Sequence, residues 1–289
     1  MLRPFRLLEP TTAAEASTEL GRLGEQARVY AGGAELVLLM RHGILQADYL
    51  VNVKGIPSLH GVTWDGTMAR VGAATTHSQV EQDPVVRRYL PTLALAAGTI
   101  GNVRVRSHGT IGGNLCFADP HSDPAAPLLV HDARVVLANT TGERRLTLDE
   151  FIVGTFETAI EPDEILTAVE AGPLPPGFGE AFLRIERYHR PTVNVASGVR
   201  LSDGRIAEAR LAVGCIGART VRLPDLEKRV IGLALDEAAR VAREYGATLA
   251  ELLEPVDDLL GTAEYKIHIA CVLLGRAIAK AAQTNGASE

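Results

Sequence analysis

A short segment rich in proline and glycine divides this chain of 289 residues into two unequal parts. The segment Ala171–Gly177 holds three prolines and two glycines in seven residues. Proline and glycine interrupt regular secondary structure, so we predict a domain boundary there. The length agrees with this division, since a domain usually takes about 100 to 200 residues.

Helix and strand patterns alternate before this segment. A helical turn is predicted at Leu36–Arg41, and a capping box at Thr76 and Gln79 predicts a helix that runs toward Ala97. The predicted strands are short apolar or alternating runs: Arg28–Ala31, Tyr49–Val53, a hairpin over Val62–Ala73, Val135–Ala138, Arg145–Leu148 and Ile165–Val169.

The part after the segment begins with strands and ends with helices. Asp203-Gly204 is a typical hairpin turn, and helices are predicted at Leu235–Tyr245 and Ala263–Ala282. The predicted strands are Ala181–Arg187, Val193–Leu201 and Ile206–Val213. This order predicts an antiparallel sheet backed by helices.

Charge and composition exclude several classes of protein. The formal charge of −6, without a block of lysine and arginine, argues against nucleic-acid binding. Apolar runs such as Leu36–Met40 are far shorter than the roughly 18 residues of a membrane span. The charged opening Met1–Pro10 is not a signal peptide, so we expect a cytoplasmic protein. The three cysteines lack C-x-x-C spacing, which predicts no disulfide framework and no cysteine-ligated metal centre.

The first feature with chemical meaning is a glycine pair between a predicted strand and a helical turn, in Ala31-Gly-Gly-Ala-Glu-Leu36. Adjacent glycines permit positive φ and present consecutive N–H groups, which can bind a phosphate without any side chain. The alternative interpretation is that Gly32 and Gly33 only close a tight turn.

The second feature is Gly109-Thr-Ile-Gly-Gly-Asn114, whose glycine pair lies 80 positions after the first pair and which is followed by Asp119-Pro120 and Asp123-Pro124. Glycine allows close approach to a diphosphate, and a carboxylate accepts hydrogen bonds from sugar hydroxyls. The spacing matches neither a Rossmann fold nor a P-loop, so an ordinary NAD or ATP site is not indicated. Alternatively, the aspartates before prolines only begin turns.

Together, these motifs in this order resemble the FAD-binding subunit of molybdenum hydroxylases, the group that includes carbon monoxide dehydrogenase and xanthine dehydrogenase. The similarity covers essentially the whole chain. The segments that carry it are Pro10–Ala16, Ala31–Leu36, Ile100–Arg104, Gly109–Asn114, Ala118–Pro120 and Asp123.

The resemblance implies an α+β fold of the vanillyl-alcohol-oxidase (PCMH) type, in which two subdomains hold FAD beside a C-terminal α+β domain with an antiparallel sheet. On this basis we expect FAD-binding subdomain 1 at residues 1–55 and subdomain 2 at 56–172. The C-terminal domain, of the type found in the carbon monoxide dehydrogenase flavoprotein, is expected at 178–285.

The resemblance also implies which residues bind FAD and predicts no catalytic or metal-binding residue. Ile100 would lie near the adenine, Asp123 would accept hydrogen bonds from hydroxyls, and Leu166 would lie against the isoalloxazine ring. The pyrophosphate would be bound by Ala31, Gly32, Gly33, Ala34, Glu35 and Leu36 and by Thr110, Gly112, Gly113 and Asn114.

Two departures from the family pattern affect the site. Ala34 stands where relatives usually carry Gln, Thr or His, so one side-chain hydrogen bond to the cofactor is expected to be missing. The segment Glu186–Pro191 would approach the flavin, but Pro191-Thr192 replaces an Asp and an aromatic residue. Tyr188 is then a candidate for covering the ring by its chemistry alone.

The function implied is electron transfer within an oxidoreductase complex. Electrons would pass from [2Fe-2S] clusters in a small iron-sulfur subunit through FAD to an external acceptor, after a large subunit with a molybdopterin cofactor has oxidised the substrate. Two such heterotrimers would form the whole complex. The alternatives are a stand-alone FAD oxidase or dehydrogenase of the same fold, and a non-redox module whose glycine loops bind nothing.

Four other side chains near the motifs have simpler interpretations. His77 belongs to a helix start, and Cys116 is expected to be a buried, unreactive thiol. Arg104 and Arg106 flank the second glycine motif, where they either steer phosphate or form a solvated face of a strand.

Overall fold

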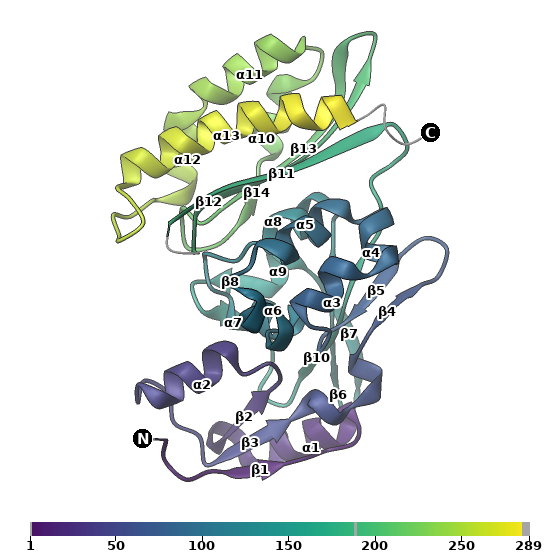
Figure 1. Cartoon of the computed structure of the whole chain (residues 1–289), viewed down its shortest axis with the longest axis vertical. Helices are drawn as coiled ribbons and strands as arrows, with labels where there is room; N and C mark the ends of the chain where they lie inside the picture. Colours follow the sequence, from purple (N-terminus) through teal and green to yellow (C-terminus); the bar gives the residue numbers. More distant parts are fainter. Residues whose placement is uncertain (1, 188–189, 285–289) are drawn as a thin grey trace.

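The computed structural model describes residues 2–187 and 190–284, so Tyr188 and the last residue of the predicted C-terminal domain lie outside the described residues. Three larger sheets follow one another along the described part of the molecule, and a fourth sheet has only two strands (Figure 1). The N-terminal sheet lies at the bottom of the view, the second sheet in the middle and the C-terminal sheet at the top. Helices and sheets are thus segregated into layers, which confirms the predicted α+β class.

The first sheet is small and parallel, with its strands in the order β1-β3-β2. The predicted strand–helix–strand unit is confirmed, and its helix begins at Ala34 because Gly33 turns the chain directly into it. The elements are β1 (Arg6–Leu8), α1 (Ala13–Leu23), η1 (Gly24–Gln26), β2 (Ala27–Tyr30), α2 (Ala34–Arg41), β3 (Tyr49–Asn52), η2 (Val53–Gly55) and η3 (Pro57–Leu59).

The second sheet is antiparallel, in the order β4-β5-β10-β6-β7, and confirms the predicted hairpins. Its strands are β4 (Val62–Trp64), β5 (Ala69–Gly72), β6 (Arg134–Asn139), β7 (Gly142–Thr147) and β10 (Ile165–Ala171), beside the small hairpin of β8 (Ile152–Gly154) and β9 (Glu157–Thr158). The helices on it are α3 (His77–Gln82), α4 (Pro84–Tyr89), α5 (Pro91–Thr99), α6 (Val103–His108), α7 (Ile111–Phe117), α8 (Ala125–Val130) and α9 (Leu148–Phe151).

The prediction of one helix from Thr76 toward Ala97 is wrong. The capping box at Thr76 is confirmed, but the chain then forms three short helices, because Pro84 and Pro91 each begin a new one. Proline lacks the N–H that a continuous helix needs and is favoured in the first helical turn. Each break turns the chain, so the three short helices α3, α4 and α5 pack against one another.

The third sheet has four antiparallel strands, in the order β11-β12-β13-β14. Its predicted strands and its two predicted helices are confirmed, and two further helices, α10 and α12, were not predicted. The elements are β11 (Phe178–Arg187), β12 (Arg190–Ser202), β13 (Arg205–Gly214), β14 (Val221–Arg222), α10 (Pro224–Val230), α11 (Leu235–Glu244), α12 (Gly246–Leu253) and α13 (Ala263–Thr284).

The second and third sheets share one hydrophobic core. Every residue of α8 is buried, and the core around this helix includes Phe182, Ala196 and Ala212 from the third sheet. Burial of this apolar surface fixes the third sheet against α8 and the loop that precedes it. The residue limits 1–55, 56–172 and 178–285 for the domains remain a prediction.

Candidate functional site

The first glycine loop, Ala31–Leu36, leads from β2 into α2. Gly33 is the N-cap of α2 with φ 74° and ψ 3°, a left-handed conformation that glycine adopts without strain. Within the described chain no side chain caps α2, so the N–H groups of its first turn lack that acceptor. Ala34 is exposed and the other residues of the loop are half-buried. The loop therefore presents main-chain donors at a helix N-terminus, where an anion is favoured.

The second glycine loop, Gly109–Asn114, begins α7 but uses its main-chain donors internally. Thr110 is the N-cap, and its Oγ1 accepts a hydrogen bond of 3.1 Å from the Gly113 N–H. The Gly112 N–H donates to the Ala73 carbonyl over 2.9 Å, and the Asn114 N–H donates to the Thr110 carbonyl over 2.9 Å. What the loop can still offer a ligand is the hydroxyl proton of Thr110 and the amide group of Asn114.

The two glycine loops lie in direct contact, although they are far apart in sequence. A Cβ atom at Gly32 would lie 2.2 Å from the carbonyl oxygen of His108 and 2.8 Å from the Cα of Gly109. Such distances leave no room for a side chain, so glycine is required where the loops meet. The structure therefore brings both predicted motifs to one place.

The two adjacent glycines of the second loop, Gly112 and Gly113, have different surroundings. Gly112 is buried, and a Cβ atom there would lie 2.6 Å from the Cβ of Ala73. Gly113 is exposed, and a Cβ atom there would approach only the Thr110 hydroxyl, at 2.9 Å. Gly112 thus allows α7 to pack against the second sheet, whereas Gly113 is the glycine that faces outward.

Ile100 and Leu166 lie at different depths. Ile100 is half-buried at the end of α5, and its carbonyl accepts a hydrogen bond of 3.2 Å from Arg106. Leu166, in β10, is 4% exposed and belongs to the core of the second sheet. Leu166 is therefore packed among other core side chains in this structure, and its contact with a flavin ring stays a prediction.

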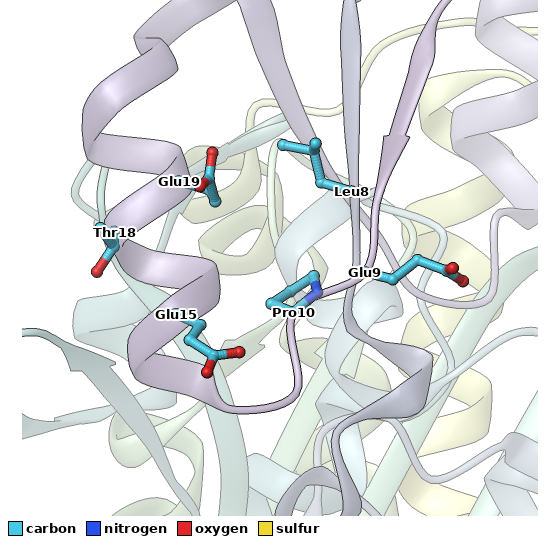
Figure 2. Close-up of a pocket in the computed structure, with 6 residues that line it drawn as sticks. All are labelled: Leu8, Glu9, Pro10, Glu15, Thr18 and Glu19. Carbon is cyan, nitrogen blue, oxygen red and sulfur yellow. The ribbon is translucent and has the colours of Figure 1, made fainter.

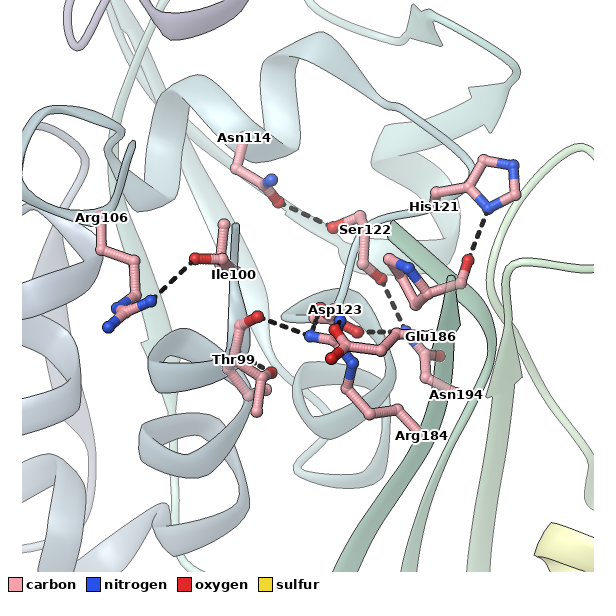
Figure 3. A network of polar contacts seen from close by, with 12 residues as sticks. Thr99, Ile100, Arg106, Asn114, His121, Ser122, Asp123, Arg184, Glu186 and Asn194 are labelled. Atoms are coloured by element: carbon pink, nitrogen blue, oxygen red, sulfur yellow. Dashed lines mark hydrogen bonds and ion pairs between the residues drawn. The ribbon is translucent and has the colours of Figure 1, made fainter. Parts of the chain in front are cut away.

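A mostly polar loop, Asp119–Asp123, connects α7 to α8 and has hydrogen-bond partners on both sides; we call it the aspartate loop. Figure 3 shows Asp123 facing Arg184 and Asn194 from the third sheet. The guanidinium of Arg184 lies 2.7 Å from Asp123 Oδ2, and the amide of Asn194 donates to Asp123 Oδ1 over 3.0 Å. On the other side, the Ser122 hydroxyl donates to the Asn114 side chain over 2.7 Å.

Burial gives the Asp123 carboxyl an unusual proton affinity. Loss of water around this 3% exposed residue raises its pKa to about 6, although Arg184 and Asn194 oppose the shift. The carboxylate form is therefore present at neutral pH, which is the form that accepts hydrogen bonds from hydroxyl groups.

Charged side chains from α2, the aspartate loop and β12 lie near one another beside the first glycine loop. Arg190 of β12 lies 3.4 Å from Asp119 of the aspartate loop. Burial raises the pKa of Glu35 in α2, while Arg190 lowers it and Asp119 raises it. The start of β12, within the predicted segment Glu186–Pro191, therefore approaches the first glycine loop.

The structure also shows the surroundings of the four side chains with simpler interpretations, which are Arg104, Arg106, His77 and Cys116. Arg104 and Arg106 lie on α6, not on a strand, and Arg106 pairs with Glu81 at 3.5 Å. Burial, with a smaller effect of Arg106, lowers the pKa of His77 to about 4. Burial also raises the pKa of the Cys116 thiol to about 12, in agreement with an unreactive thiol.

A surface pocket of about 350 Å³ lies away from these motifs, between the end of β1 and α1 (Figure 2). Its lining carries the carboxylates of Glu9, Glu15 and Glu19, which would repel an anionic cofactor. Among residues 2–187 and 190–284, no group of three or more His, Cys, Asp or Glu side chains is arranged to hold a metal ion. No helix in the same ranges is long and apolar enough to cross a bilayer.

Sequence reasoning missed Arg184 and Asn194, because they lie 61 and 71 positions from Asp123. Asn194 nevertheless carries a signal, since it is a fully buried amide between two valines in the apolar strand β12. A buried amide requires hydrogen-bond partners, so its position indicates a polar contact across the core.

Comparison with known families identifies the class of protein. Residues 3–173 match the FAD binding domain in molybdopterin dehydrogenase, and residues 183–281 match the CO dehydrogenase flavoprotein C-terminal domain. The chain therefore belongs to the family of FAD-binding medium subunits of molybdenum hydroxylases, as the sequence predicted. It has an FAD-binding domain and is part of an oxidoreductase.

Individual relatives agree with this membership over nearly the whole chain. The carbon monoxide dehydrogenase medium chain of Hydrogenophaga pseudoflava is 31% identical over 95% of this chain and 96% of its own length. The 6-hydroxypseudooxynicotine dehydrogenase complex subunit alpha of Paenarthrobacter nicotinovorans is 31% identical over 89% and 88%. A solved structure of reconstituted CO dehydrogenase from Oligotropha carboxidovorans superposes with a TM-score of 0.93, at 29% identity, over 98% and 99% of the two chains. The fold is thus of the predicted PCMH type.

Proposed function

We propose that this chain binds FAD across the junction where the two glycine loops meet and passes electrons from iron-sulfur clusters of a partner subunit through FAD to an external acceptor. The observation that carries the proposal is the contact of Gly32 with His108 and Gly109, since it joins both motifs at one site. FAD, when bound, supplies the ability to accept electrons singly and release them in pairs.

The residues present suit the parts of this cofactor. The first turn of α2 offers main-chain N–H groups to the pyrophosphate, through the segment Ala31–Leu36. Thr110, Gly113 and Asn114 flank the same place with polar side chains and one exposed glycine. Asp123 offers a carboxylate to hydroxyls, and Ile100 offers a half-buried apolar side chain to the adenine.

Gly112 and Leu166 have structural roles in the proposed FAD site. Gly112 brings α7 against Ala73, which positions Thr110 and Gly113. Leu166 belongs to the core of the second sheet on which the flavin would rest. No general acid or base is required of this chain, because the oxidation of substrate would take place in the large molybdopterin-binding subunit.

The partners we propose are that large subunit and a small subunit with [2Fe-2S] clusters, in a dimer of heterotrimers. Support comes from the relatives, whose names refer to carbon monoxide and 6-hydroxypseudooxynicotine although both chains are similar to this one. Substrate choice therefore belongs to another subunit. The three cysteines of this chain are unpaired, which suits the reducing cytoplasm.

The experiment is to purify the full chain, titrate it with FAD and then add the partner subunits. We expect yellow protein with noncovalent FAD that oxidises no small molecule alone, and flavin reduction only when the partners and their substrate are present. Turnover of a small molecule by the isolated chain would instead favour a stand-alone oxidase or dehydrogenase. A colourless chain that refuses added FAD would overturn the proposal.

A further inference from the structure

We infer that Arg184 in the third sheet is a positioning residue for the FAD site. Its side chain binds two segments that the proposed function assigns to FAD, and it is itself part of neither. The inference rests on the proposed function. It gives the C-terminal domain a direct part in cofactor binding, through a side chain that none of the sequence motifs contains.

The guanidinium of Arg184 joins the end of α5 to the aspartate loop. Its Nη1 donates to the Thr99 carbonyl over 2.6 Å and to Asp123 Oδ2 over 2.7 Å, and its Nη2 pairs with Glu186 (Figure 3). Only 9% of the side chain is exposed. Thr99 immediately precedes Ile100, so a single buried cation connects the proposed adenine contact with the proposed hydroxyl contact.

Asn194 also binds the aspartate loop through hydrogen bonds. Its amide Nδ2 donates to the Ser122 carbonyl over 3.1 Å and to Asp123 Oδ1 over 3.0 Å. A Cβ atom at Gly214 would lie 2.5 Å from the Asn194 side-chain oxygen, so glycine there leaves room for the amide. Both carboxylate oxygens of Asp123 are therefore held by the third sheet, and each retains a lone pair for a ligand hydroxyl.

The contacts fix the direction of the carboxylate before any ligand arrives. A carboxylate oriented in advance loses less rotational freedom on binding than a mobile one. Hydrogen bonds that involve an ionised partner are also about twice as strong as neutral ones. Arg184 thus contributes by orientation and by charge, without touching the cofactor.

The pH dependence of FAD binding separates the charge effect of Arg184 from a purely structural effect. The charged or titratable groups that face Asp123 are Arg184 and Glu186 of β11 and the buried Cys215 thiol after β13. Arg184 opposes the rise in the pKa of Asp123, while Glu186 adds to that rise. Without Arg184 the carboxyl would hold its proton to higher pH, and affinity for FAD would be lost mainly on the acidic side.

The test is an FAD titration of the full chain, followed by flavin fluorescence between about pH 5.5 and 9, with Arg184→Gln and Arg184→Lys. We expect Arg184→Gln to weaken binding by about tenfold or more at pH 7, the worth of one hydrogen bond to a charged group, and by less at pH 9. Arg184→Lys keeps the charge and should restore part of both the affinity and the pH midpoint. Arg200→Gln, which breaks the more exposed pair with Glu208, is the matched control and should leave binding unchanged.

A double-mutant cycle that combines Arg184→Gln with Asp123→Asn tests whether Arg184 acts through Asp123. If Arg184 acts through Asp123, Asp123→Asn removes most of the pH dependence, and adding Arg184→Gln costs little more. Additive losses, or an equal loss at every pH in a variant with unchanged circular dichroism, would overturn the inference while FAD binding by the native chain stands. A native chain that binds no FAD would overturn both the inference and the proposed function.

Discussion

The two glycine loops each contain an adjacent pair of glycines and lie in contact with each other, but they differ in which main-chain N–H groups remain available to a ligand. In the first loop, Gly33 begins α2 and no described side chain caps the helix. In the second loop, Thr110 caps α7, and the Ala73 carbonyl takes the N–H of Gly112. The first loop is therefore open to an anion, whereas the second is a closed helix start that supports it.

The difference shows that a glycine can be required for two reasons. Gly32 and Gly112 are needed because backbone segments touch there, at distances that exclude a Cβ atom. Gly113 is exposed and has space around it apart from the Thr110 hydroxyl. Substitutions at the two kinds of glycine should therefore affect stability and FAD binding in different proportions.

The largest effect is expected for Gly32→Ala. The added methyl would lie 2.2 Å from the His108 carbonyl oxygen, so the loops must separate. We expect the free energy of unfolding to fall by about 3 kcal/mol and FAD to be lost, measured by urea denaturation and by absorbance at the flavin band. Gly55→Ala, at a glycine with open space, is the control; equal losses in both variants would refute contact between the loops.

The next effect is on the pH dependence of stability. It concerns His77, which contacts the second glycine loop. Its main-chain N–H donates to the Gly109 carbonyl over 2.9 Å, and burial lowers the pKa of its side chain to about 4. The unfolded chain, with an ordinary histidine pKa near 6.5, binds the proton first, so stability is complete above that value and declines as pH falls toward 4. Because the folded and unfolded pKa values differ by about 2.5, we expect a loss of up to about 3 kcal/mol without FAD. Thermal melts of His77→Leu should lack this part of the acid dependence; identical profiles would contradict the role.

A matched pair of variants compares the glycines of the second loop. Gly112→Ala should cost about 2 kcal/mol of stability, because its methyl would overlap Ala73. Gly113→Val should change stability by less than about 1 kcal/mol but abolish FAD binding, because it places a branched side chain where a diphosphate needs bare backbone. Calorimetry with an FAD titration separates the two, and full flavin occupancy in Gly113→Val would remove the second loop from the site.

The smallest effect is expected for Arg190→Gln, beside the first loop. About half of this side chain is exposed, so its ion pair with Asp119 should contribute less than about 0.5 kcal/mol to stability. Affinity for FAD should change by less than about threefold, and more at low than at high salt. A tenfold loss in a titration at physiological salt would mean that Arg190 contacts the cofactor itself.

The sequence was informative where chemistry is local. Short motifs predicted the strand–helix–strand unit, the hairpins, the capping box at Thr76 and the family, because turn and cap preferences act over a few residues. The same reasoning failed at Pro84 and Pro91, where the apolar pattern continued while the backbone could not. It also missed Arg184, whose contacts with Thr99 and Asp123 depend on how the third sheet packs on α8. The assignment of individual residues to FAD remains a prediction.

Hydrogen–deuterium exchange with and without FAD tests most directly whether the two loops hold one cofactor. We predict that FAD slows exchange most at Ala34–Leu36, whose N–H groups lack a side-chain cap in the described chain, and less at Ile111–Asn114, whose N–H groups already have acceptors. The aspartate loop should be protected along with them. Protection confined to one loop, or found only elsewhere in a chain that does bind FAD, would contradict the account.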